Sequence, residues 1–135
     1  MMTRKRPKVG VIRRETWRHA KRASGDYPTA SSRSGKWLCF ISDSDADEMW
    51  EKVAEATKSG RLGSESFMQS ARDGFAGRVI EVCTYDWANR DDVFRVRGEL
   101  RDLGWLSKIP YKSDEDSRSG LYQATGHRRI SKYYD

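Results

Sequence analysis

Two cationic side chains near the end of the sequence have the chemistry to bind an anion. Lys112 and Arg118 lie in the polar run 111–122, which closes on the tetrapeptide Ser-Gly-Leu-Tyr. Ammonium and guanidinium groups are common phosphate ligands, and a guanidinium can present two parallel donors to one phosphate. Three acidic residues, 114–116, stand between the two cations, so the run also fits a solvated hairpin loop whose charges neutralise one another. The spacing alone leaves both interpretations open.

Four further side chains are candidates for a ligand site. Lys36 opens a short apolar run, and Arg72 lies in the middle of a long connection, residues 61–77, that contains three glycines. Long connections inside compact domains are often functional. Tyr122 offers a hydroxyl or a stacking face, and Trp87, in a short polar turn, is the ring expected to be most exposed.

Cysteine and histidine are too few and too scattered for a metal site. Cys39 and Cys83 each stand alone in an apolar run, and His19 and His127 are far apart in the sequence. We therefore expect no metal and no cofactor. Isolated thiols of this kind are typical of a reducing compartment, which predicts a cytoplasmic protein. Because no run approaches the roughly 18 apolar residues of a membrane span, we also expect no membrane partner. The sequence does not indicate the oligomeric state.

The net charge of +6 is concentrated at the start of the chain. Residues 1–36 carry 11 Lys and Arg against 2 acidic residues, whereas residues 37–135 carry 15 basic and 18 acidic residues. Residues 1–34 are interpreted as a basic, extended or partly disordered arm, and residues 35–135 as a single domain. Such an arm could contact nucleic acid nonspecifically, by neutralising phosphates and stacking Trp17, or could be a solvated leader.

Hydrophobic periodicity predicts alternating strands and helices after residue 34. The predicted strands cover 36–41, 79–85, 106–112, 121–124 and 129–134, and the predicted helices fill 44–60 and 89–104. The first strand is a continuous apolar run, which indicates burial on both faces. Each helix has a polar cap at its start, glycine at its end and an apolar stripe. Trp50 and Val93 belong to these stripes, so we expect both to be buried against one face of a sheet. The predicted class is α+β.

Several short segments spread over residues 35–125 form a spaced combination: Gly35-Lys36-Trp37-Leu38, Gly60-Arg61-Leu62-Gly63, Asp91-Asp92-Val93, Glu99 to Gly104, Tyr111-Lys112-Ser113-Asp114 and Ser119-Gly120-Leu121-Tyr122. This combination resembles the basophilic leukaemia-expressed protein family. Small microbial members, labelled phosphothreonine lyase domain proteins, also end much like residues 129–134. The resemblance implies the fold of the mRNA cap-binding translation initiation factor: a curved, mainly antiparallel sheet of four to six strands with two main helices on one face.

Together with the resemblance, these residues predict a domain that binds a phosphate-bearing ligand such as a nucleotide, an RNA end or a phosphopeptide. The predicted ligand-binding set is Lys36, Arg72, Lys112, Arg118, Tyr122 and Trp87. One alternative is a phosphothreonine lyase-like enzyme, in which Lys36 or Lys112 would be the base and His127 the acid, since elimination needs both. The related lyases carry a histidine two residues after the first lysine, and Leu38 occupies that place here. Another alternative is a protein-interaction, regulatory or inhibitor module that uses the acidic helix 43–55 and the basic arm.

Overall fold

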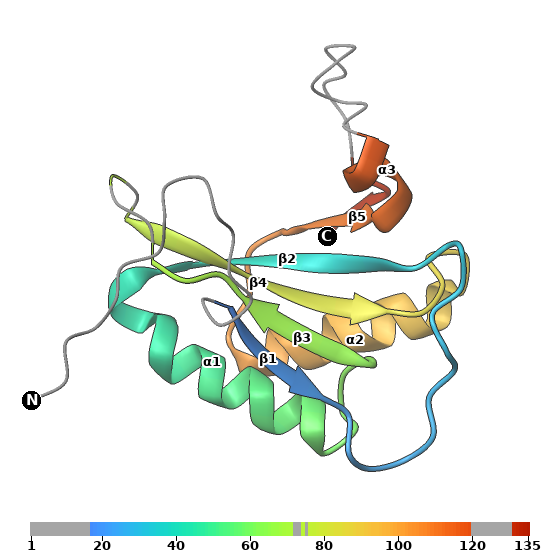
Figure 1. The fold of residues 1–135 in the computed structure, drawn as a ribbon, viewed down its shortest axis with the longest axis horizontal. Helices are drawn as coiled ribbons and strands as arrows, with labels where there is room; N and C mark the ends of the chain where they lie inside the picture. The colour runs from blue at the N-terminus through green and yellow to red at the C-terminus, as the bar shows by residue number, and fades with distance from the viewer. Residues whose placement is uncertain (1–16, 72–73, 75, 120–130) are drawn as a thin grey trace, which may run out of the picture.

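The protein folds around one six-stranded antiparallel sheet (Figure 1). The computed structural model describes residues 17–71, 74, 76–119 and 131–135, without the side chains of residues 118 and 119. The strands are β1 (Arg18–Lys21), β2 (Gly35–Ser42), β3 (Glu65–Met68), β4 (Gly77–Thr84), β5 (Pro110–Ser113) and β6 (Tyr133–Tyr134), in the order β1-β3-β4-β2-β5-β6. The helices are α1 (Asp43–Lys58), α2 (Arg90–Leu103) and the short α3 (Asp114–Ser119). The predicted α+β class is confirmed.

Local sequence explains where the two long helices begin and end. Acidic residues fill the first turn of each helix, where the dipole is positive, and a basic residue stands in the last turn of each. The Asn89 side chain accepts a hydrogen bond from the Asp92 N–H and so caps α2, which ends at Gly104 with a φ of 129°. Helix α1 begins at Asp43, slightly earlier than expected, after Ser42.

Alternation along the central strands separates two faces of the sheet. Trp37 and Cys39 of β2 are fully buried beneath the helices, and the Trp37 indole N–H donates to the carbonyl of Val93 in α2 at 3.0 Å. Trp50 of α1 and Val93 of α2 are both buried in the same core, which confirms that both helical stripes pack on one face. We call the opposite side, without α1 or α2, the open face.

The structure corrects the predicted boundary at residue 35. Residues 18–21, expected to be part of the arm, form β1, which pairs antiparallel with β3 and buries Ala20. The Arg22 guanidinium, which follows directly, donates to the carbonyls of Leu62 at 2.8 Å and Gly63 at 3.2 Å. A strand with a single buried apolar residue leaves almost no hydrophobic signal, which is why periodicity missed it.

Removing β1 provides a direct test of this boundary. Deletion of residues 1–30 removes the β1–β3 ladder and the Arg22 hydrogen bonds, so we expect it to lower the free energy of unfolding by about 2 kcal/mol or more. Deletion of residues 1–16 keeps β1 and is the matched control. Urea denaturation of both truncations measures the difference; equal midpoints would mean that β1 adds no stability.

Three other predicted elements differ from the structure. The long connection 61–77 contains β3, a four-residue strand too short for a clear period. The polar run after β5, expected to be a hairpin loop, begins with the helix α3, whose first turn is entirely acidic. Of the final predicted strand, 129–134, the structure describes residues 131–134, and within this part Tyr133 and Tyr134 pair with β5. The predicted strand at 121–124 lies outside the described residues.

Candidate functional site

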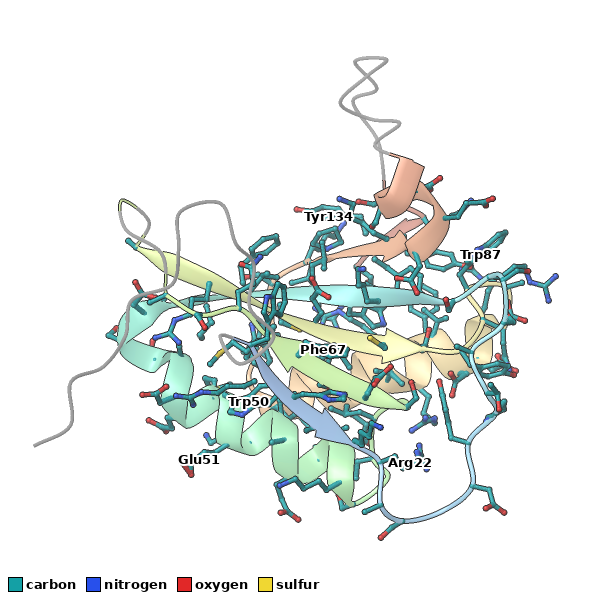
Figure 2. The ribbon with its side chains drawn as sticks, in the orientation of Figure 1. Arg22, Trp50, Glu51, Phe67, Trp87 and Tyr134 are labelled. Atoms are coloured by element: carbon teal, nitrogen blue, oxygen red, sulfur yellow. The ribbon has the colours of Figure 1, made fainter. Side chains whose placement is uncertain are left out.

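The open face carries a row of polar side chains that crosses the sheet. In the strand register, Lys112 of β5 stands directly opposite Lys36 of β2. Lys36 in turn stands opposite Cys83 of β4, and Cys83 opposite Glu65 of β3. A second row, parallel to the first, contains Leu38, Glu81 and Phe67, and the Phe67 ring stacks on His19 at 4.3 Å between centroids (Figure 2). The open face is therefore neither purely apolar nor purely charged.

Lys36 is the best-defined cation on this face. Its Nζ lies 3.1 Å from Oδ1 of Asp114 and 3.9 Å from Oε1 of Glu81, and its side chain is 18% exposed. Burial lowers the pKa of Lys36, but Glu81 and Asp114 outweigh that effect, so the net shift is upward. The raised pKa keeps Lys36 positively charged at neutral pH.

The first residue of α3 is held firmly beside Lys36. Oδ2 of Asp114 accepts a hydrogen bond from the Ser34 hydroxyl at 2.6 Å, and the Asp114 backbone N–H donates to the Ser34 carbonyl at 2.9 Å. Ser34 directly precedes β2, so one side of α3 is tied to the beginning of that strand. The carboxylate of Asp114 therefore occupies a fixed position next to the ammonium group.

Glu81 provides the second carboxylate of the cluster. Burial raises its pKa most strongly, Asp114 raises it further, and Lys36 and Lys112 lower it. Two lysines placed directly opposite each other on one face destabilise a sheet unless their charges are offset. Glu81 and Asp114 supply that offset. The cluster thus contains two lysines, Lys36 and Lys112, and two carboxylates. One of these carboxylates, Asp114, belongs to the short helix α3.

The structure brings together only part of the predicted set. Lys36 and Lys112 are neighbours on the open face, while Arg72, Tyr122 and His127 lie outside the described residues, as does the side chain of Arg118. No placement relative to Lys36 is therefore assigned to those four side chains.

Trp87 differs from its expected exposure. The indole is half-buried against the core, and the Lys132 ammonium lies 4.2 Å from the ring centroid. Its backbone is also fixed, because its N–H donates to the Arg33 carbonyl and its carbonyl accepts from the Tyr133 hydroxyl, both at 2.6 Å. Trp87 therefore packs against residues 132 and 133, and Lys132 covers one face of its ring.

The positions of two residues on the open face were not predicted from the sequence. Glu81 was placed in a strand without a role, although alternation along 79–85 sets it on the face opposite Val82. Phe40 was expected to be buried on both faces of its strand, yet it is 59% exposed. The signal was present in β2 itself, because Lys36, Leu38 and Phe40 share one side of the strand.

The residues that the structure describes contain neither a group of metal ligands nor a membrane-spanning helix. Within those residues, no three or more His, Cys, Asp or Glu side chains are grouped closely enough to hold a metal ion. Of the helices in the same part of the chain, none is long and apolar enough to cross a membrane.

Comparison with protein families gives a match over most of the chain. The model of the family described as basophilic leukemia-expressed protein Bles03 matches residues 13–116. The chain belongs to the Bles03 family. The Bles03 match includes β1, Lys36, Lys112 and Asp114, and it ends before Arg118, Tyr122 and His127.

Solved structures of eIF4E proteins share this fold. Schistosome eIF4E complexed with m7GpppA and 4E-BP matches this Bles03 chain with a TM-score of 0.60 and 18% identity, over 76% of this chain and 59% of that one. Ascaris suum eIF4E-3 with the m2,2,7G cap matches with a TM-score of 0.55 and 15% identity, over 76% of this chain and 57% of that one. The likeness confirms the predicted cap-binding-factor fold. The Bles03 chain spans less than two thirds of the length of these structures.

Proposed function

We propose that this domain binds a phosphate-bearing ligand on its open face, with Lys36 and Lys112 as the groups that contact the phosphate. The observation that carries the proposal is the direct opposition of these two lysines across β2 and β5. Like charges at such a position oppose folding, and a protein tolerates such a local conflict most readily at a functional site. The solved neighbours support the ligand class, since they are complexed with the cap compounds m7GpppA and m2,2,7G.

The Asp114 carboxylate is the counter-ion that a ligand would replace. It contacts the Lys36 ammonium at 3.1 Å, a distance at which a phosphate oxygen could make the same charge-assisted hydrogen bond. Asp114 is on the six-residue helix α3, at the edge of the site, whereas Glu81 is on the central strand β4. Ligand binding would therefore exchange the Asp114 contact and leave the Glu81 contact in place.

Substitutions on the two sides of this ion pair should change affinity in opposite directions. We expect Lys36→Gln to weaken binding of inorganic tripolyphosphate about 10-fold or more, because one charged hydrogen bond is lost. We expect Asp114→Asn to strengthen binding, because the amide keeps its contact with Ser34 but no longer competes for the ammonium. Isothermal titration calorimetry measures both constants.

The matched control for this experiment is Lys52→Gln. Lys52 has the same charge, is half exposed and stands on α1, on the other side of the sheet, so its loss should leave the affinity unchanged. Absence of tripolyphosphate and nucleotide binding at millimolar concentration would reject the proposal. Equal affinities of the Lys36 and Lys52 variants would remove Lys36 from the site.

A lyase-like enzyme remains a second proposal on the same residues. Lys36 and Lys112 are adjacent candidates for the base, and His127 is the candidate for the acid. The raised pKa of Lys36 works against a base role, because a base must be deprotonated to accept a proton. Release of phosphate from a phosphothreonine peptide, lost in Lys36→Gln, would establish the enzyme; stable binding without release favours the ligand-binding domain.

A protein-interaction module is supported by a different surface. A hollow of about 370 Å³ lies beside α1 and α2. Its lining includes the apolar side chains of Ile41, Met49 and Leu103, the acidic side chains of Asp45 and Glu48, and Lys52. This surface fits a basic amphipathic peptide, and the schistosome neighbour is complexed with 4E-BP. None of its described lining residues is Lys36, Glu81, Lys112 or Asp114, so both activities are compatible.

The free cysteines and the basic residues at the start of the chain bear on where the protein acts and what else it contacts. Cys39 and Cys83 are free thiols, which supports a cytoplasmic protein. Residues 1–17, which carry much of the excess positive charge, are proposed to add nonspecific nucleic-acid contact that weakens with salt.

A further inference from the structure

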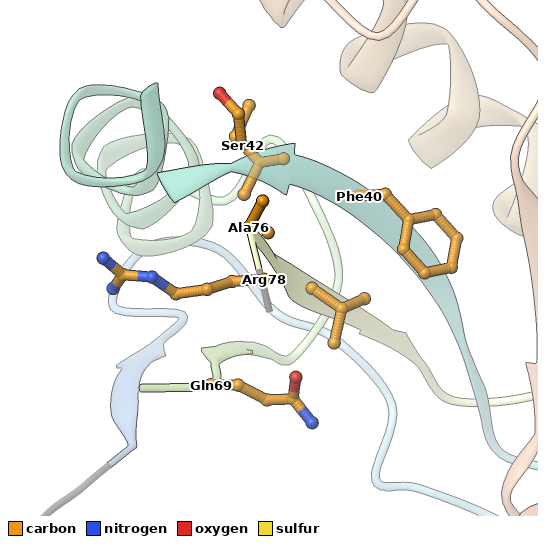
Figure 3. A pocket seen from close by; sticks show the side chains of 8 residues that line it. Phe40, Ser42, Gln69, Ala76 and Arg78 are labelled. Atoms are coloured by element: carbon orange, nitrogen blue, oxygen red, sulfur yellow. The ribbon is translucent and has the colours of Figure 1, made fainter. Parts of the chain in front are cut away.

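An exposed aromatic ring and an open hollow lie together on the open face, away from the lysine pair. The hollow measures about 630 Å³, and its lining includes Phe40 and Val79 from the paired strands β2 and β4, with Gln69 just after β3 (Figure 3). This volume falls within the range of about 300–1,000 Å³ that small-molecule sites occupy. Phe40 is 59% exposed although β2 is a central strand of the sheet, flanked by β4 and β5.

The chemistry of this hollow fits an uncharged ring better than a phosphate. Among the described residues that line it, the one cation is Arg78. Arg78 is directed to α1, where its Nε contacts Oδ1 of Asp43 at 2.9 Å, and its side chain is only 14% exposed. The charge is thus already neutralised. The lining is otherwise mostly apolar, with the Gln69 amide as a donor and acceptor. A flat apolar ring beside an amide is a combination that binds nucleobases, by stacking and by hydrogen bonds to the base edge.

The distance from the lysine pair sets the length of the ligand. Lys36 and Phe40 are four residues apart on β2 and share the open face, so their backbones are about 13 Å apart. Leu38 lies between them with Glu81 opposite, which gives a sugar an apolar surface and a carboxylate acceptor. A nucleoside monophosphate is too short to reach both ends. A nucleoside triphosphate has a base at one end and its terminal phosphates at the other, and so matches this spacing.

We infer that the open face is a binding site for nucleoside triphosphates, in which the base stacks on Phe40 beside Gln69 and the phosphates contact Lys36 and Lys112. This inference rests on the proposed phosphate-binding function and adds the ligand class and the base-binding residues. The affinity for a nucleoside triphosphate should therefore depend on two separate groups on β2, the aromatic ring of Phe40 and the ammonium group of Lys36.

Calorimetric titration with GTP, ATP, GMP and inorganic tripolyphosphate tests the inference. The native protein should bind the triphosphates about 5- to 100-fold more tightly than tripolyphosphate, since stacking adds to the phosphate contacts. Phe40→Ala should remove this advantage and leave tripolyphosphate affinity unchanged, whereas Phe40→Trp should retain it. Lys36→Gln should weaken both probes. Leu106→Ala, at an apolar residue that is 73% exposed and lies between α2 and β5, is the matched control.

Each outcome has a distinct meaning. If tripolyphosphate binds through Lys36 but the triphosphates bind no more tightly, or Phe40→Ala has no effect on them, the base site is rejected and the proposed function stands. If neither probe binds, the proposed function fails as well. Equal affinity for GMP and GTP would overturn the length argument. Phe40-dependent binding of a single-stranded oligonucleotide without binding of GTP or ATP would overturn the inference in favour of RNA.

Discussion

Arg97→Ala should lower the free energy of unfolding by about 3–5 kcal/mol, as expected when one partner of a buried charged network is removed. Arg97 lies on the buried side of α2 and is 1% exposed. Its guanidinium donates to the backbone carbonyls of Asp135 at 2.6 Å, Trp105 at 2.9 Å and Ser107 at 2.7 Å. Truncation would leave three carbonyls without their donor and a cavity beside the Trp37 ring.

The matched control for this prediction is Arg101→Ala, one turn later on α2. Arg101 also contacts the last residue, with Nη2 3.1 Å from Oδ1 of Asp135, but it is 37% exposed. We expect its loss to cost less than about 1 kcal/mol, because exposed ion pairs add little. Urea denaturation of the native protein and both variants measures the difference. If both substitutions lowered the free energy of unfolding by a similar amount, the hydrogen bonds of Arg97 would not be what stabilises the C-terminal region.

Trp50→Ala should also destabilise the fold by about 3–5 kcal/mol, because truncating a large buried ring loses apolar burial and leaves a cavity. Trp50 is 7% exposed and belongs to the core formed by α1, α2 and the sheet. Its neighbour Glu51 lies on the solvent side of the same helix and supplies the control, with an expected change of at most about 0.5 kcal/mol for Glu51→Ala (Figure 2). Chemical denaturation compares the two; a cost below about 1 kcal/mol would place Trp50 outside the core.

Local signals in the sequence were sufficient for the helices and the central strands. The stripes containing Trp50 and Val93 and the glycine after each helix depend only on nearby residues, and the structure confirms them. Strands β1 and β3 are four residues each and owe their order to pairing with each other and with β4, which no local pattern records. Arg97 is a cation within an apolar stripe, but its three carbonyl partners lie beyond the helix. Trp105 and Ser107 follow just after α2, and Asp135 is far along the chain.

The candidate site was predictable to a smaller degree. The opposition of Lys36 and Lys112 required the sheet order, which the family resemblance implied and the periodicity did not. The Asp114 contact with Lys36 depends on how α3 follows β5, a tertiary detail. Phe40 was misjudged because a continuous apolar run predicts burial on both faces, whereas alternation along β2 leaves one side of it open.

The strand order has a consequence for how the chain acquires its fold. Among the strands of the described residues, only the pairs β3–β4 and β5–β6 are consecutive in the chain and also adjacent in the sheet. Strand β2 pairs instead with β4 and β5, which are synthesised much later. The long chain segments between paired strands must therefore close into loops before most of the strand pairs can form. This order of events predicts slow folding for a domain of this size. During synthesis, β2 would expose its unpaired backbone until β4 emerged, so chains interrupted between the two strands should be prone to aggregation.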